Sequence, residues 1–260
     1  MRPASGTVGA MTGHRKGQGR RAGGRASSRG GRGGSAAGRG RPQERPASLR
    51  KSTLPREVVA EIESTGRAGK AGHAVRLLEQ AIEAIERGRP DEAGRLAEEA
   101  KAQAPRAPGI REVLGLAYYQ AERYREALRE LQSFRRISGR REHNHLIADC
   151  HRALGAPEKA VPLAQEALRA RIPEAARAEA AVVGGAALAD LGRFDEAVAM
   201  LRRFPTRDAE ARPYDLRIWY VLGDVLERSG RPSEAAREFQ KIVRHDPDAF
   251  DAVERLARIG

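Results

Sequence analysis

The residues best suited to metal chemistry lie between positions 143 and 151. They are His143, His145, Asp149, Cys150 and His151. In a helix, His145 and Asp149 would lie one turn apart and could meet a metal, whereas His143 and His151 would lie on a different side. A closed zinc site needs four convergent ligands, and this spacing does not place them on one face. We therefore predict no metal and no cofactor, with Cys150 a small core residue and His151 packed between helices.

Sequence patterns typical of enzymes are also missing. Gly69-Lys70 lacks the upstream glycine and the following Ser or Thr of a phosphate-binding loop. We find no strand–turn–helix pattern for a dinucleotide and no recognisable set of Ser, His and Asp. The acidic residues fall mostly on exposed helix faces. The sequence therefore predicts a protein that is not an enzyme.

Composition restricts the cellular setting. The single cysteine excludes an intrachain disulfide, so nothing calls for an oxidising compartment. No stretch approaches ~18 consecutive apolar residues, and the basic N-terminus lacks the apolar core of a secretory signal. We expect a cytoplasmic protein without a membrane partner.

Positive charge is concentrated at the N-terminus, in residues 1–52, which we call the basic tail. It holds 11 Arg and 2 Lys against one acid, Glu44, and so carries about +12 of the total +13. Few large apolar side chains occur there, so we expect disorder. Its arginines could pair with phosphate or stack on bases, which predicts RNA or ribosome contact; the residues concerned are Arg29, Arg32, Arg39 and Arg41.

A compositional origin is the alternative explanation for the basic tail. The chain has 42 Arg but only 6 Lys, which indicates a GC-rich, bacterial gene. Drift in such a gene yields Gly, Ala, Arg and Pro without selection. The start codon is also open, because Met11 could replace Met1.

A short string recurs along the rest of the chain and indicates the fold. The alanines that end the five copies are 34, 33, 37 and 38 residues apart. Glycine suits a left-handed helix end, proline suits a first helical turn, and the acids complement a helix N-terminus. The copies are Gly88-Arg89-Pro90-Asp91-Glu92-Ala93, Ala121-Glu122-Arg123-Tyr124-Arg125-Glu126-Ala127, Gly155-Ala156-Pro157-Glu158-Lys159-Ala160, Gly192-Arg193-Phe194-Asp195-Glu196-Ala197 and Gly230-Arg231-Pro232-Ser233-Glu234-Ala235.

The last copy carries the fullest motif. It reads Trp219-x-x-Leu222-Gly223-x-x-Leu226, followed by Ala235, Phe239 and Pro247, and a second copy has Leu114-Gly115-x-x-Tyr118 with Ala127 and Leu131. Over residues 74–260 the chain resembles the tetratricopeptide repeat family. The resemblance implies an all-α fold, a right-handed α-solenoid of about five helix pairs spanning residues 53–260.

The spacing and the ends of the array add detail to this expectation. The long spacings predict extended connections near residues 171–178 and 205–213. Capping helices are expected around Pro55–Ser64 and over residues 248–260, the latter with Phe250, Val253, Leu256 and Ile259 as its apolar face.

The resemblance further implies a concave groove that binds a peptide or partner protein. Helical geometry selects ten positions, which we call the groove face, although a solvated helix face is the alternative for each. A Lys/Asn/Arg clamp for a C-terminal carboxylate is absent, because the matching positions hold Glu112, Leu116, His145 and Asp149. The groove face consists of Glu112, Leu116, Tyr119, His145, Asp149, Arg152, Tyr220, Asp224, Glu227 and Arg228.

Three functional hypotheses follow. The repeat predicts a protein-binding scaffold of unknown partner, and the basic tail predicts an RNA- or ribosome-associated factor as the alternative. Self-association is the third, because Leu78, Ile82 and Ile85 would give the first copy an apolar groove side. A covering N-terminal helix would explain the same residues.

Overall fold

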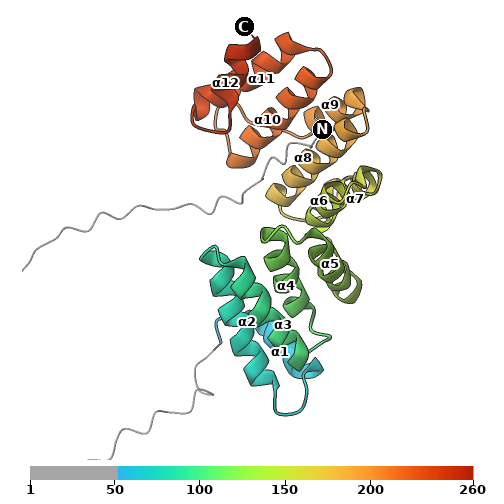
Figure 1. Cartoon of the computed structure of the whole chain (residues 1–260), viewed down its shortest axis with the longest axis vertical. Helices are drawn as coiled ribbons and strands as arrows, with labels where there is room; N and C mark the ends of the chain where they lie inside the picture. Colours follow the sequence, from blue (N-terminus) through green and yellow to red (C-terminus); the bar gives the residue numbers. More distant parts are fainter. Residues whose placement is uncertain (1–51, 260) are drawn as a thin grey trace, which may run out of the picture. The chain divides into compact units, whose positions relative to one another are not determined.

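The computed structural model describes residues 52–259. Internal contacts divide the chain into residues 1–52 and 53–260, and the account below concerns the second unit (Figure 1). Every regular element within the described residues is an α-helix, which confirms the all-α prediction. The helices are α1 Arg56–Thr65, α2 Ala71–Glu86, α3 Pro90–Gln103, α4 Pro108–Gln120, α5 Tyr124–Ser138, α6 Asn144–Ala153, α7 Pro157–Arg169, α8 Glu174–Asp190, α9 Phe194–Arg203, α10 Pro213–Arg228, α11 Pro232–His245 and α12 Ala252–Ile259.

Ten of these helices form five successive pairs. The pairs are α2 with α3, α4 with α5, α6 with α7, α8 with α9, and α10 with α11. The first helices of several neighbouring pairs also touch, as α2 touches α4, α6 touches α8 and α8 touches α10. Helix α1 precedes the first pair and packs on α2 and α4, and α12 follows the last pair and packs on α11.

The recurring string forms the turn inside each pair. After α10, Gly230 has a φ of 76°, and Arg231 N donates to Leu226 O at 2.9 Å, closing the helix end. Glu122 takes the same left-handed conformation after α4, with a φ of 58°, where the other turns have glycine. The alanine that ends each string is fully buried between its two helices.

In the pairs that begin with α4, α8 and α10, close approach of the two helices depends on a glycine in the first helix. A Cβ atom at Gly115 would lie 2.7 Å from Leu131 of α5, and one at Gly223 would lie 2.7 Å from the Phe239 ring of α11. The motif glycine therefore sets the distance between the helices, while the facing side chain fills the space that it leaves.

The structure corrects one of the two expected extended connections and agrees with the other. Residues 171–178 are not an extended connection, because α8 begins at Glu174 and absorbs most of the extra length. Its first residues, Glu-Ala-Ala-Arg-Ala, are strong helix formers. The connection between α9 and α10 is extended as predicted and covers residues 204–212.

The C-terminal helix is also shorter than expected. It begins at Ala252 rather than near residue 248, and Phe250 lies before it with a φ of 59°. Phe250 and Val253 are 47% and 45% exposed, so they do not form the buried face that the sequence suggested. Ala252, which the pattern did not single out, is fully buried instead.

At the other end, α1 covers the apolar surface that suggested self-association. Leu78 is fully buried in one cluster with Ile62 of α1, against which Ile82 and Ile85 also pack. The apolar character of this first copy is therefore explained within the chain itself.

Candidate partner-binding groove

A row of polar contacts crosses the groove face from α4 to α10. Tyr119 Oη donates to Asp149 Oδ2 at 2.7 Å, and Arg152 Nε donates to Asp149 Oδ1 at 3.1 Å. Arg152 Nη1 also reaches Asp190 Oδ2 at 3.4 Å, and Arg228 Nη2 reaches Asp190 Oδ1 at 3.4 Å. We call these five residues the groove ladder. They join the first helices of four successive pairs.

Burial strengthens the electrostatic interactions among Tyr119, Asp149 and Arg152 at one end of the ladder. The pKa of Tyr119 lies well above its usual value because the hydroxyl is buried and because Asp149 carries a negative charge beside it. Burial alone would lower the pKa of Arg152, but Asp149 and Asp190 outweigh it and raise that pKa. The adjacent Cys150 is fully buried, as predicted, and burial followed by the Asp149 charge raises its pKa to about 12. Its thiol is a core group rather than a nucleophile.

The groove positions of the last pair are contacted by the end of the chain. The Tyr220 ring stacks on Phe250, with centroids 4.5 Å apart. Arg255 of α12 donates to Asp224 Oδ1 at 2.9 Å and to Glu227 Oε2 at 2.8 Å. Three of the four groove-face residues on α10 are therefore contacted by the end of the chain, and the fourth, Arg228, already contacts Asp190.

A depression of about 490 Å³ opens at the start of α6. Its apolar lining comes from Leu116 of α4, Leu146 of α6, and Pro173 and Ala176 around the start of α8. Helix α6 has only 10 residues, whereas α4 has 13 and α8 has 17. Because α6 begins a turn late, no side chain fills the space between its neighbours there.

The rim of the depression is polar and is formed by Glu142, His143 and His145. Burial, and then the nearby charge of His143, lowers the pKa of His145 to about 4, so this imidazole is neutral at pH 7. Its Nδ1 atom is buried without a hydrogen-bond partner. The depression therefore combines apolar side chains with a neutral imidazole ring.

Comparison with known proteins identifies the architecture. The family model described as Tetratricopeptide repeat matches residues 78–139 and 182–252, which together make up half of the chain. The chain belongs to the tetratricopeptide repeat family. No curated protein sequence matches this repeat protein. Within the described residues, no helix is long and apolar enough to cross a membrane.

Solved structures agree with this fold at low sequence identity. TTC0263, a thermophilic tetratricopeptide repeat protein from Thermus thermophilus, is 20% identical, with a TM-score of 0.54 over 72% of this chain and 98% of that one. YrrB, a tetratricopeptide repeat protein with an unusual peptide-binding site, is 20% identical, with a TM-score of 0.52 over 70% and 90%. PilW, a type IV pilus biogenesis factor, is 18% identical, with a TM-score of 0.61 over 72% and 84%.

Within this repeat array, a group that could hold a metal forms from His143 and two acids that the sequence did not single out as ligands. Side chains of Glu112, Glu142 and His143 bring ligand atoms within 4.8 Å of one another. His143 Nε2 contacts Glu112 Oε1 at 2.7 Å, and Arg140 contacts both carboxylates, at 2.7 and 3.1 Å. Because Arg140 already supplies positive charge to both acids, we assign no metal to this group. The sequence suggested Asp149 and His145 as a possible pair of metal ligands, but Asp149 instead accepts hydrogen bonds from Tyr119 and Arg152.

Sequence reasoning missed several residues that organise the groove face. Asp190 joins Arg152 and Arg228 within the ladder, Arg255 contacts Asp224 and Glu227 of α10, and Arg217 pairs with Glu179 at 2.9 Å. The helical rule that gave the groove positions of the other repeats, applied around Gly185, would have selected Asp190. The four tail arginines named above lie outside the described residues.

Proposed function

We propose that the protein is a non-catalytic scaffold that binds a segment of a partner protein on its groove face. The depression at α6 is the observation that carries this proposal. Its apolar lining suits one apolar side chain of a bound segment, and the neutral His145 ring lies beside that lining. Membership of a family whose arrays bind proteins supports the same function, as does the peptide-binding site named for YrrB.

The groove ladder fits a supporting role in this function. Its charged groups are satisfied by one another, so a partner gains little by contacting them and would leave some unpaired. Leu116 and His145 are the groove-face residues that line the depression at α6. We therefore assign the main recognition contacts to these two residues and their neighbours.

A matched pair of variants tests the proposal. Leu116→Glu places a charge in the depression, and Ala199→Glu places the same charge at an exposed position on α9. Capture of proteins from the source organism should lose a specific partner with Leu116→Glu and keep it with Ala199→Glu. Retention by both variants would contradict the groove proposal, and thermal melts would confirm that both remain folded.

The RNA- or ribosome-associated function suggested by the basic tail is the alternative. Its arginines lie outside the described residues. Material captured by both variants but lost after RNase treatment would favour it. A cytoplasmic location remains our prediction under either function.

A further inference from the structure

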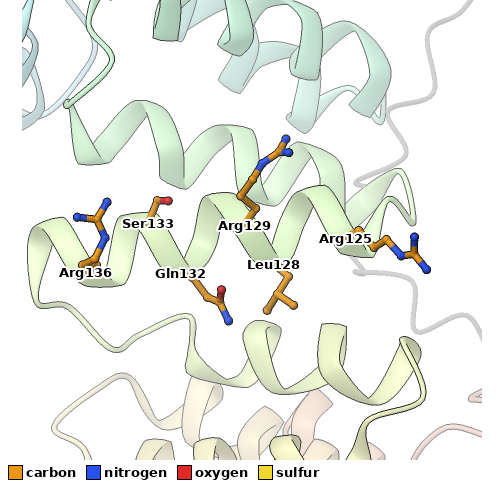
Figure 2. A pocket seen from close by; sticks show the side chains of 6 residues that line it. All are labelled: Arg125, Leu128, Arg129, Gln132, Ser133 and Arg136. Atoms are coloured by element: carbon orange, nitrogen blue, oxygen red, sulfur yellow. The ribbon is translucent and has the colours of Figure 1, made fainter.

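Three arginines form a stripe along the exposed side of α5, a second helix that contributes nothing to the groove ladder. Arg125, Arg129 and Arg136 line a depression of about 380 Å³ together with Leu128, Gln132 and Ser133 (Figure 2). Positions i, i+4 and i+11 fall on one helix face and span about 16 Å along the axis. Figure 2 shows Arg125 and Arg136 at the two ends of the row, with Arg129 between them.

Charge around this stripe is not balanced. Residues 123–141 contain seven arginines and two glutamates, a local excess of five positive charges in a folded unit that carries about +1. Glu126 pairs with Arg123, leaving Glu130 as the remaining acid of the segment. Glu130 is 2% exposed and already accepts closer contacts from Lys101 and Arg111, at 3.2 and 2.7 Å.

The charges of the three stripe arginines are therefore largely free to interact with a ligand. Arg129 reaches Glu130 only at 3.4 Å and is 65% exposed. Arg125 and Arg136 are exposed, and no described residue forms an ion pair or hydrogen bond with either side chain. The other arginines of the segment are used elsewhere, as Arg135 and Arg141 both pair with Glu166.

We propose that the Arg125–Arg129–Arg136 stripe binds the phosphate backbone of a single-stranded nucleic acid. Guanidinium groups present forked donors that match phosphate oxygens, and the amide of Gln132 and the hydroxyl of Ser133 add donors between them. Leu128 is the one apolar side chain in the depression, so an acidic peptide would gain little apolar burial there. A linear row of positive charge fits an extended polyanion better than a compact ligand.

The test compares two triple variants of the full-length protein. The stripe variant carries Arg125→Gln, Arg129→Gln and Arg136→Gln. The control variant removes the same charge from three exposed arginines on other second helices, Arg95, Arg169 and Arg237, also by substitution with Gln. Because both variants keep the whole chain, the basic tail contributes equally to each.

The probe is a fluorescein-labelled oligouridylate 20-mer, with an oligothymidylate 20-mer as the DNA arm and polyglutamate as an acidic competitor. Affinity is measured by anisotropy over a range of salt concentrations. Each single-strand phosphate contact contributes about 0.7 to the salt slope, so the stripe variant should lose about 2 from the slope relative to the control. The Leu116→Glu variant should bind RNA like the wild type, which separates this proposal from the groove proposal.

Several results would overturn the assignment. Equal losses in the two triple variants would mean that overall charge, not the stripe, drives binding. An unchanged slope in the stripe variant, or no binding by the wild-type protein, would show that the stripe makes no phosphate contact. Competition by polyglutamate as effective as that by unlabelled RNA would assign the stripe to acidic polymers in general.

Discussion

Replacing Gly223 with alanine tests how the motif glycine controls helix pairing. The new Cβ would lie 2.7 Å from two carbons of the Phe239 ring, which is fully buried in α11. Overpacking a core costs about 1–3 kcal/mol, and a rigid, fully buried ring that also contacts Tyr220 places this site at the upper end. The higher helix propensity of alanine relative to glycine offsets about 1 kcal/mol of this cost. We expect Gly223→Ala to lower the free energy of unfolding by about 1–2 kcal/mol.

Gly94→Ala is the matched control. Gly94 also lies inside a helix and is buried, but its Cβ would meet Tyr118 at 3.6 Å, an ordinary van der Waals contact. Here only the propensity gain remains, so the variant should be stabilised by about 0.5–1 kcal/mol. The same substitution is therefore expected to have opposite signs at the two positions.

Urea unfolding of the full-length variants, followed by far-UV circular dichroism, measures both changes. A double variant with Phe239→Leu should recover part of the loss at Gly223, because the shorter side chain vacates the space that the new methyl needs. If Gly223→Ala were as stable as the wild type, steric contact with Phe239 would not set the pairing distance, and our explanation of the motif would be wrong.

Three further outcomes are expected. The pKa of His145 falls from 6.5 in the unfolded chain to about 4 in the folded protein. As the pH falls, the unfolded chain therefore binds this proton first, and the folded state loses stability between pH 6.5 and pH 4. Substitution His145→Gln should reduce that loss by up to about 3 kcal/mol, as measured by acid titration of the free energy of unfolding. Arg255→Ala removes the cation shared by two acids of α10, so hydrogen exchange should speed up in α12 while α2 keeps wild-type protection. Cys150 is buried and its pKa is about 12, so iodoacetamide at pH 8 should label it only in urea, and rapid native labelling would contradict the packing described.

The repeat could be read from the sequence because local chemistry recurs with it. Each turn needs a left-handed residue, each second helix begins with residues suited to a helix N-terminus, and each crossing needs a small side chain. These requirements act within a few residues, so copies such as Gly230 to Ala235 are visible without knowledge of tertiary contacts.

Features that depend on competition between elements could not be read in the same way. The longer spacing before Ala197 was assigned to a connection, but helix propensity after Glu174 extended α8 instead. The late start of α6 creates the depression beside Leu116, and no single residue signals it. Arg255 lies outside every recurring string, yet it satisfies two acids that spacing alone had assigned to the groove.

This arrangement constrains where a partner can bind. A segment that binds across the groove ladder must replace the bonds of Asp149, whose two oxygens already accept from Tyr119 and Arg152. Each charge left unpaired in this buried setting costs more than a new contact returns. A segment that enters the depression beside Leu116 displaces only water and leaves the ladder intact. Recognition should therefore be concentrated at the late start of α6, while the ladder holds the neighbouring first helices in the positions that keep the depression open.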